Sequence, residues 1–477
     1  MSQLYVVVLA VIVVVLLSVA IYRTFQVKTK ADYLVAGRSL PAAVLVLTLL
    51  TSWIGAGSLF AGAENAYRNG FAALWQAGGG WLGLLLIYFI APRARKFAQF
   101  TLPDLLEARY NQTARVLGTI AILFAYVGIT SYQFKGGGNV LHLIFPETVT
   151  PELGTYLIAA FVILTTALAG MSSVAYMDVA IGSLVTGICI VATPYLFLQA
   201  GGWAGLHSAL PATHFQVLGN LTLVRALEFL VPTMLLMLGN QVMYQKFFSA
   251  KSERAARISV VGWILGTLLL ETLIVAIAVI GSAMYPSGEV AKQPYEIIPY
   301  TARHGLPALL GAVLLGAVFA KVISTASNYL FSPATNLIND VFVRYMAPNA
   351  TNKQVMIVSR LAVVLLGCWA LYQAVYAQSI LQKMLYAYTI YSAALTPVVL
   401  AAFFSKRVTA WGAVAAIASG TVITLLWDIQ AVRTFFPPIL AARDAIFPAL
   451  FAAVLALIVV SFVTPAPSAE QLARFAE

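Results

Sequence analysis

Two adjacent hydroxyl side chains, Ser324 and Thr325, lie inside an otherwise apolar segment that reads Lys321-Val322-Ile323-Ser324-Thr325-Ala326-Ser327-Asn328. Small hard cations prefer several oxygen ligands and no sulfur. These two hydroxyls and three main-chain carbonyls would supply five oxygens, which suits such an ion. Ser and Thr side chains also commonly donate to carbonyls of their own helix. The spacing alone favours that ordinary role.

Two other segments combine glycine with polar residues in the middle of apolar runs. One reads Thr51-Ser52-Trp53-Ile54-Gly55-Ala56-Gly57-Ser58 and the other reads Leu238-Gly239-Asn240-Gln241. Main chain released from helical hydrogen bonds inside a membrane is tolerated only beside protein or a water-filled cavity. Such breaks in corresponding positions of two halves indicate the binding site of a transporter. The competing interpretation, that Gly55 and Gly57 only permit close helix packing, is less favoured when both segments are considered together.

The composition shows what kind of scaffold must position these residues. Of the 477 residues, 61% are hydrophobic and 9% are charged, whereas soluble domains average about 45–50% and roughly 25%. A soluble globular protein and a disordered protein are therefore excluded. The formal charge of +11 does not indicate a nucleic-acid partner, because the basic residues lie in short loops between apolar segments, as they do in membrane proteins.

A helix that crosses a bilayer needs about 20 mostly apolar residues, and the sequence contains thirteen such runs. They cover residues 4–22, 42–62, 72–92, 115–134, 153–172, 178–199, 225–245, 258–284, 306–330, 356–377, 384–404, 409–427 and 442–463. We therefore predict an all-α integral membrane protein with about thirteen transmembrane helices, embedded in the lipid bilayer of the plasma or inner membrane.

The basic residues predict how the chain is oriented in the membrane. If the N-terminus lies outside, thirteen spans place the C-terminus in the cytoplasm. Of the 28 Lys and Arg residues, 19 then fall in cytoplasmic loops and 7 in outer loops. Cytoplasmic loops carry an excess of Lys and Arg, so the distribution favours an N-terminus outside and a C-terminus inside.

The two breaks divide the chain into related halves within a single transmembrane domain, residues 1–477. Spans two to six cover residues 42–199, spans seven to eleven cover residues 225–404, and in each group the break falls in the first helix. Because five is odd, consecutive groups of five helices have opposite orientations in the membrane. This predicts a five-plus-five inverted repeat, with one leading helix at 4–22 and two trailing helices within 409–463.

With these features the chain resembles the sodium:solute symporter family, and the resemblance extends from Asp32 to about Lys406. The resemblance is carried by the order and spacing of short motifs. They are Asp32-Tyr33-Leu34-Val35-Ala36-Gly37-Arg38, Thr51-Ser52-Trp53-Ile54-Gly55, Tyr176-Met177-Asp178, Gln245-Lys246-Phe247-Phe248-Ser249-Ala250-Lys251 and Ile323-Ser324-Thr325-Ala326-Ser327. The resemblance implies a LeuT-type fold and coupled transport of a solute with sodium into the cell by alternating access.

The resemblance also implies which residues hold the ion and the solute. Sodium would be held by main-chain carbonyls of Thr51, Ile54 and Lys321 and by the hydroxyls of Ser324 and Thr325. The solute would lie near the membrane midplane between the two broken helices. This points to Trp53, Gly55, Ser58, Asn240, Gln241 and Tyr244, with Gln133 of the fourth span as a further candidate.

Lys321 departs from the family pattern, in which this position is usually small. A buried ammonium is costly without a partner, and Glu271 and Asp178 are candidate partners, although Asp178 fits better as a helix-start carboxylate at the inner surface. If Lys321 points away from the ion site, only its carbonyl is used and sodium coupling persists, which we favour. If it points into the site, its charge replaces sodium or supplies a titratable group, and the alternative is a proton-coupled or sodium-independent transporter of the same fold.

Other classes of membrane protein fit the sequence less well. A six-plus-six transporter would have twelve spans, a long central inner loop and no odd leading helix. An enzyme is not expected, because neither a zinc-binding H-E-x-x-H motif nor a G-x-S-x-G nucleophile turn is present. A channel would show leak currents without saturable uptake, and a sensor usually has an output domain. No cofactor is expected besides Na+ as the coupling ion, and a sugar, an amino acid and an organic acid all remain open as the solute.

Overall fold

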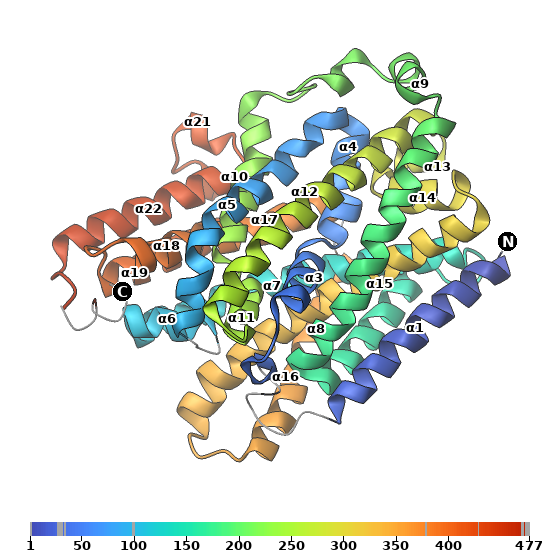
Figure 1. Ribbon diagram of the computed structural model, residues 1–477. Helices are drawn as coiled ribbons and strands as arrows, with labels where there is room; N and C mark the ends of the chain where they lie inside the picture. Colours follow the sequence, from blue (N-terminus) through green and yellow to red (C-terminus); the bar gives the residue numbers. More distant parts are fainter. Residues whose placement is uncertain are drawn as a thin grey trace.

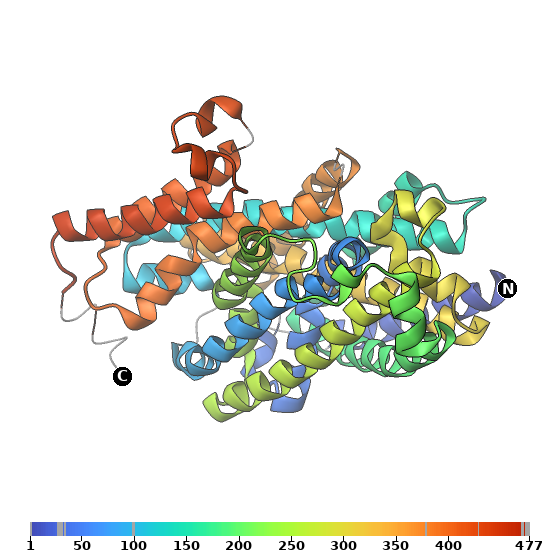
Figure 2. The same cartoon turned by 90° about the horizontal axis from the view of Figure 1, so that it is seen from above.

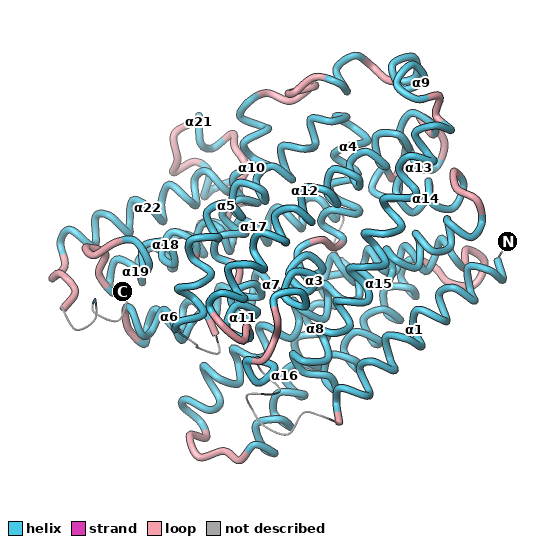
Figure 3. The backbone as a smooth tube through the Cα atoms, viewed as in Figure 1, coloured by secondary structure: helices cyan, strands magenta, loops and turns pink. Residues whose placement is uncertain are grey.

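The computed structural model of the protein is an assembly of helices (Figures 1 and 3). It describes residues 2–25, 32, 35–97, 101–376, 379–427, 429–468 and 472. Within these ranges the only extended pairing is an isolated bridge between Leu40 and Ala250. The predicted all-α fold class is therefore confirmed. Tyr33 and Leu34 of the first family motif, and Lys28 and Lys30 of the first basic loop, lie outside the described residues.

The helices that carry the predicted spans have the following bounds. They are α1 (Ser2–Thr24), α3 (Ala42–Trp53), η2 (Gly57–Gly62), α4 (Ala63–Asn69), α5 (Leu74–Phe97), α7 (Gln112–Ile144), α8 (Pro151–Gln199), α10 (Leu223–Gly239), α11 (Gln241–Ser249), α12 (Glu253–Met284), α15 (Ala308–Asn336), η6 (Leu337–Met346), α16 (Asn352–Tyr376), α17 (Ile380–Ala394), α18 (Thr396–Phe404), α19 (Ala410–Leu426) and α22 (Ile446–Val463).

Short helices lie in the connections between these segments. They are η1 (Ala36–Arg38), η3 (Gly70–Ala73), α6 (Leu102–Arg109), α9 (Gly202–Ala209), η4 (Ala212–Phe215), α13 (Glu289–Lys292), η5 (Pro294–Glu296), α14 (Ile297–His304), α20 (Gln430–Arg433) and α21 (Pro438–Ala441).

Within the described residues, ten helical segments are long and apolar enough to cross a membrane. Three shorter apolar helices, Gln3–Val19, Ala42–Trp53 and Ala410–Leu426, coincide with further predicted spans. The number thirteen thus stays a prediction. Two predicted spans, 153–172 and 178–199, belong to the one helical segment α8, in which Pro151–Leu168 and Val174–Gln199 are the apolar stretches.

The helix α7 is longer than the predicted span 115–134, because it continues through Gly136, Gly137 and Gly138. A Cβ atom on Gly138 would lie 2.5 Å from the main-chain nitrogen of Thr155 in α8. Small residues allow helices in membranes to approach this closely. The triple glycine, which lies beyond the predicted span, is therefore part of the contact surface between α7 and α8.

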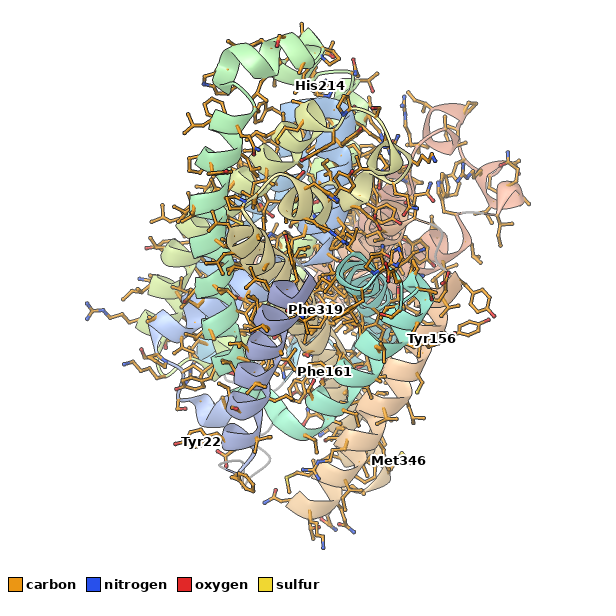
Figure 4. The ribbon with its side chains drawn as sticks, turned by 90° about the vertical axis from the view of Figure 1, so that its right-hand side faces the viewer. Tyr22, Tyr156, Phe161, His214, Phe319 and Met346 are labelled. Atoms are coloured by element: carbon orange, nitrogen blue, oxygen red, sulfur yellow. The ribbon has the colours of Figure 1, made fainter. Side chains whose placement is uncertain are left out.

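The two ends of the helix assembly carry different parts of the chain (Figure 4). Tyr22, at the end of α1, and Met346, at the end of η6, lie at one end, and His214 lies at the other. Successive spans run in opposite directions, so the prediction places residues 23–38 and 344–360 on one side and residues 200–225 on the opposite side. The positions of Tyr22, Met346 and His214 agree with this alternation. We refer to the Tyr22 end as the inner end, following the predicted orientation.

The first and last helices lie at opposite edges of the molecule. Seen from above, α1 is at one edge in blue and α22 is at the other in red (Figures 1 and 2). Helix α22 packs against α19, whereas α15 packs against α7, α8 and α1. The broken helices α3–η2 and α10–α11 lie between these edges, where α15 and α12 cover the first break and α17 covers the second.

Candidate functional site

The first interruption separates α3 from η2 and is held open by side chains of other helices. Helix α3 ends at Trp53, and Ile54 has extended main-chain angles (φ −80°, ψ 120°). The amide of Ala56 donates to the Gln133 side-chain oxygen at 2.8 Å instead of to a helix carbonyl. A Cβ atom on Gly55 would lie 2.7 Å from the Thr325 side chain. Glycine is therefore needed here so that α15 can approach the opened main chain.

Four oxygen atoms converge where α15 meets the first break. The Thr325 hydroxyl lies 3.0 Å from the carbonyl oxygen of Ile54, 3.3 Å from that of Thr51 and 3.0 Å from that of Lys321. The contact with Lys321, four residues earlier, is the ordinary bond of a helical threonine to its own helix. The contacts with Thr51 and Ile54 cross between helices, so the structure brings four of the five predicted ion ligands together.

The Lys321 side chain points into this group of oxygens. Its ammonium is fully buried and donates a hydrogen bond to the carbonyl oxygen of Thr51. In the part of the chain that the structure describes, no carboxylate forms a salt bridge with it. The expected partners Glu271 and Asp178 both make other contacts. The predicted ion ligands are thus already in contact with a hydrogen-bond donor of the protein itself.

The fifth predicted ion ligand, Ser324, faces a different group of polar side chains. Its hydroxyl donates to the Asp178 carboxylate. The same carboxylate accepts from the Thr48 hydroxyl at 2.5 Å and forms a 3.2 Å salt bridge with Lys246. Asn328 accepts from Lys246 at 2.9 Å. A buried ion pair keeps its charges only when additional hydrogen bonds compensate for lost water, and here both charges have them.

This cluster corrects two expectations from the sequence. Asp178 is not at a helix start on the inner surface, because it lies within α8 and is fully buried. Lys246 is not in a cytoplasmic loop, because it is also fully buried. The sequence offered a lysine and an aspartate in separate motifs, but only the packing of α11 against α3 and α15 shows that they form a pair.

The second interruption is supported by tyrosine side chains that sequence reasoning missed. Asn240 has extended angles (φ −64°, ψ 112°), much like Ile54 at the first break. Its side chain accepts from Tyr126 and donates to Tyr329, each at 2.7 Å. The amide of Gln241 donates to the Tyr391 hydroxyl at 2.9 Å. Tyr391 thus satisfies a main-chain amide at the break, as buried main-chain groups require, while Tyr126 and Tyr329 hold the Asn240 side chain.

The predicted solute residues fall into two groups rather than one. Trp53, Gly55, Ser58 and Gln133 lie around the first break. Gln241 instead binds the amide of Leu102 in α6 at 3.0 Å and also donates to Asn336. Tyr244 donates to the carbonyl of Leu238 across the second break, at 2.9 Å. In this conformation Asn240, Gln241 and Tyr244 are therefore used to hold the second break.

Glu271 of α12 joins the first group. One of its carboxyl oxygens accepts from the Trp53 indole nitrogen at 3.0 Å and from the Ser58 hydroxyl at 3.4 Å. The ring of Trp53 also stacks on Tyr388 of α17, with centroids 6.3 Å apart. The sequence already showed Glu271 as an isolated acid within an apolar span, and charged residues inside membranes generally mark functional sites. We had expected its partner to be a lysine.

A second charged cluster at the inner end was not predicted. Arg115 at the start of α7 forms salt bridges of 2.6 Å with Asp104 of α6 and with Asp340 of η6, and it also pairs with Glu107. Thr101 begins α6 with a capping box that involves Asp104. The cluster ties α6, α7 and η6 together, and Leu102 at the start of α6 also binds the Gln241 side chain of α11.

Two interrupted helices within an assembly of long apolar helices are typical of a multi-pass membrane transporter. Its particular kind follows from comparison with known proteins. The chain belongs to the sodium:solute symporter family, whose sequence model matches residues 33–420. This match confirms the resemblance that the motifs suggested. The members of the family are transporters, not enzymes.

Individual relatives and structures agree with this family. The osmoregulated proline transporter of Bacillus subtilis is 23% identical over 92% of this chain and 90% of its own length. The sodium/proline symporter of Staphylococcus aureus is 26% identical over 83% of this chain and 80% of its own. A substrate-bound, outward-open structure of a Na+-coupled sialic acid symporter is 17% identical, with a TM-score of 0.82 and 98% of both chains covered. The structural likeness confirms the LeuT-type fold.

Proposed function

We propose that the protein is a secondary active symporter that carries a small zwitterionic amino acid, with proline as the first candidate, into the cell together with sodium. The observation that carries the proposal is the Thr325 hydroxyl, which reaches the carbonyls of Thr51 and Ile54 across the first break. Membership of the family supports sodium coupling. The names of the similar proteins from Bacillus subtilis and Staphylococcus aureus support proline.

In this mechanism sodium links the first broken helix to α15. Bound between the carbonyls of Thr51, Ile54 and Lys321 and the hydroxyls of Ser324 and Thr325, the ion favours the conformation that is open to the outside. Coupling arises only if the ion has different affinities for the two conformations. The membrane potential adds about 2.3 kcal/mol per charge per 100 mV. Ser324 would have to exchange its bond with Asp178 for the ion.

For the solute we propose the space beside the first break. Trp53, Gly55, Ser58 and Gln133 would form its walls, and the α3–η2 interruption offers main-chain groups that a polar solute can bind. Asn240, Gln241 and Tyr244 would meet the solute only after their present hydrogen bonds around the second break are released. Binding of the solute and movement of α10 and α11 are coupled in this proposal.

Uptake by the purified full chain in sealed vesicles tests the proposal. Labelled proline is offered under an inward sodium gradient, an inward proton gradient, both gradients or neither. We expect accumulation above the outside concentration only when the sodium gradient is present. Equilibration to the outside concentration without any gradient would instead identify a channel or a uniporter, and empty vesicles provide the background.

The position of Lys321 favours a second candidate, a proton-coupled or sodium-independent transporter. Two unit charges about 4 Å apart repel each other by about 4 kcal/mol at an effective dielectric constant of 20. That corresponds to roughly a thousandfold in affinity. Sodium can therefore occupy this site only if the ammonium moves away or loses its proton. Accumulation driven by the proton gradient alone, with no response to sodium, would select this candidate.

A further inference from the structure

A small cavity lies between η2, α5 and α12, beside the first break. It is bordered by Ser58 of η2, by Ala73 of η3, by Gln76 of α5, and by Glu271 and Ile274 of α12. Its volume is about 20 Å³, which is enough for about one water molecule. Apart from Ser58, Gln76 and Glu271, its walls are small or apolar.

Although the indole of Trp81 also approaches the Glu271 carboxyl, two oxygen atoms at this cavity accept no hydrogen bond of ordinary geometry within the described residues. They are the second carboxyl oxygen of Glu271 and the side-chain oxygen of Gln76. Both side chains are more than nine-tenths buried, at 5% and 7% exposure. The other oxygen of Glu271 is already used by Trp53 and Ser58, and the amide nitrogen of Gln76 contacts the sulfur of Met384 at 3.7 Å.

An acceptor oxygen that is buried without a donor is costly, and a buried carboxylate is costlier still. Charges inside a membrane generally pair with an opposite charge. No Lys or Arg forms a salt bridge with Glu271 anywhere in the ranges that the structure describes. A partner that satisfies both oxygens and balances an ionised Glu271 therefore needs at least two N–H or O–H donors and a positive charge.

We propose that Glu271 and Gln76 bind the positively charged amine of the solute. The secondary ammonium of proline carries two N–H donors, one for each of the two oxygens. The inference rests on the proposed function and adds that the solute is an amine rather than a sugar or a simple organic acid.

The cavity in this conformation accepts a nitrogen atom but not a whole ring. Binding of the complete solute requires η2 to move relative to α5 and α12. The interruption between the end of α3 at Trp53 and the start of η2 at Gly57 provides the place for this movement. Water in the cavity would satisfy the two oxygens when no solute is bound.

The test compares a substrate with an analogue of the same shape that lacks the amine. The full chain in vesicles takes up labelled proline, with unlabelled proline or cyclopentanecarboxylate as competitor. In the unmodified protein we expect cyclopentanecarboxylate to compete at least tenfold more weakly than proline. Glu271→Gln keeps the shape of the side chain but removes its charge. A hydrogen bond to a charged group is worth about 1.5–3 kcal/mol, so the KM for proline should rise about 10- to 100-fold.

A matched control is Glu228→Gln. Glu228 is a second buried glutamate at a span end, is paired with Arg225 at 2.8 Å and does not line the cavity. Its replacement should leave KM within about twofold. We expect the discrimination between proline and cyclopentanecarboxylate to shrink to below about threefold in Glu271→Gln and to fall also in Gln76→Leu. A lower transport rate with unchanged discrimination would show a structural role and overturn the inference.

Failure of the inference and failure of the proposed function remain distinguishable. If vesicles with the unmodified protein take up no proline, the proposed solute is wrong. Thermal stabilisation of the purified protein by pyrrolidinium then tests whether Glu271 and Gln76 bind an amine. Stabilisation of the unmodified protein that is lost in Glu271→Gln supports the inference. Absence of stabilisation in the unmodified protein overturns it.

Discussion

The ammonium of Lys321 donates a hydrogen bond to the carbonyl oxygen of Thr51, near the point where α3 ends and the first break begins. This bond connects α15 to the first broken helix in the way that a bound cation would. It places a side chain of the protein in competition with any ion that uses the same oxygens. We therefore expect the response of the transporter to cations to depend on Lys321.

Replacement of Lys321 by alanine removes that competing charge. We expect the sodium concentration for half-maximal uptake in Lys321→Ala to fall at least tenfold, because the repulsion of about 4 kcal/mol disappears. Uptake at different sodium concentrations, at constant membrane potential, measures this. Lys321→Arg, which keeps the charge, serves as the control and should not lower the sodium requirement. An unchanged sodium requirement in Lys321→Ala would show that the ion binds elsewhere.

Thr325 is the side chain whose hydroxyl reaches both main-chain oxygens of the first break. Thr325→Ala should raise the sodium concentration for half-maximal uptake about tenfold, since one ligand is lost, whereas Thr325→Ser keeps the hydroxyl and should stay close to the unmodified protein. Loss of one hydrogen bond or ligand of this kind is worth about 1 kcal/mol or more. Equal sodium requirements for the alanine and serine variants would remove Thr325 from the ion site.

The sequence predicted the scaffold and part of the site, but not how polar groups pair. Hydropathy and the two glycine-containing segments predicted the helices and both breaks, because these properties are local. Family motifs placed Thr325 next to Thr51 and Ile54. The direction of the Lys321 side chain and the pairing of Asp178 with Lys246 depend on how distant helices pack, which no local pattern encodes. The tyrosines around Asn240 were missed for the same reason, since each comes from a different helix.

The buried pair of Asp178 and Lys246 should respond to single and double replacement in different ways. Breaking a buried ion pair by removing one partner typically costs about 3–5 kcal/mol, because the other charge stays buried without compensation. Asp178→Asn should therefore lower the thermal stability of the purified protein strongly. Lys246→Met combined with Asp178→Asn should recover much of this loss, as measured by thermal unfolding in detergent. A double variant as unstable as the sum of both single variants would show that the two charges do not interact.

The carboxyl group of Glu296, in the connection between α12 and α15, should make stability depend on pH. Burial raises the pKa of this carboxyl to about 7 from its ordinary value of 4.5, so the folded protein binds this proton more tightly than the unfolded chain does. The ionised form is thus disfavoured in the fold, and the contribution of Glu296 to stability is most favourable below pH 4.5 and is lost as the pH rises to about 7. One pKa unit corresponds to about 1.36 kcal/mol, so the full effect amounts to about 3 kcal/mol.

Glu296→Gln removes this titration. Relative to the unmodified protein, the variant should gain stability at pH 8 and show little difference near pH 4.5, as measured by thermal unfolding across this range. Glu147→Gln provides the control, because Glu147 is exposed in the connection between α7 and α8 and should not change the pH profile. A gain of stability in Glu296→Gln that is the same at both pH values would mean that the residue acts through packing and not through its charge.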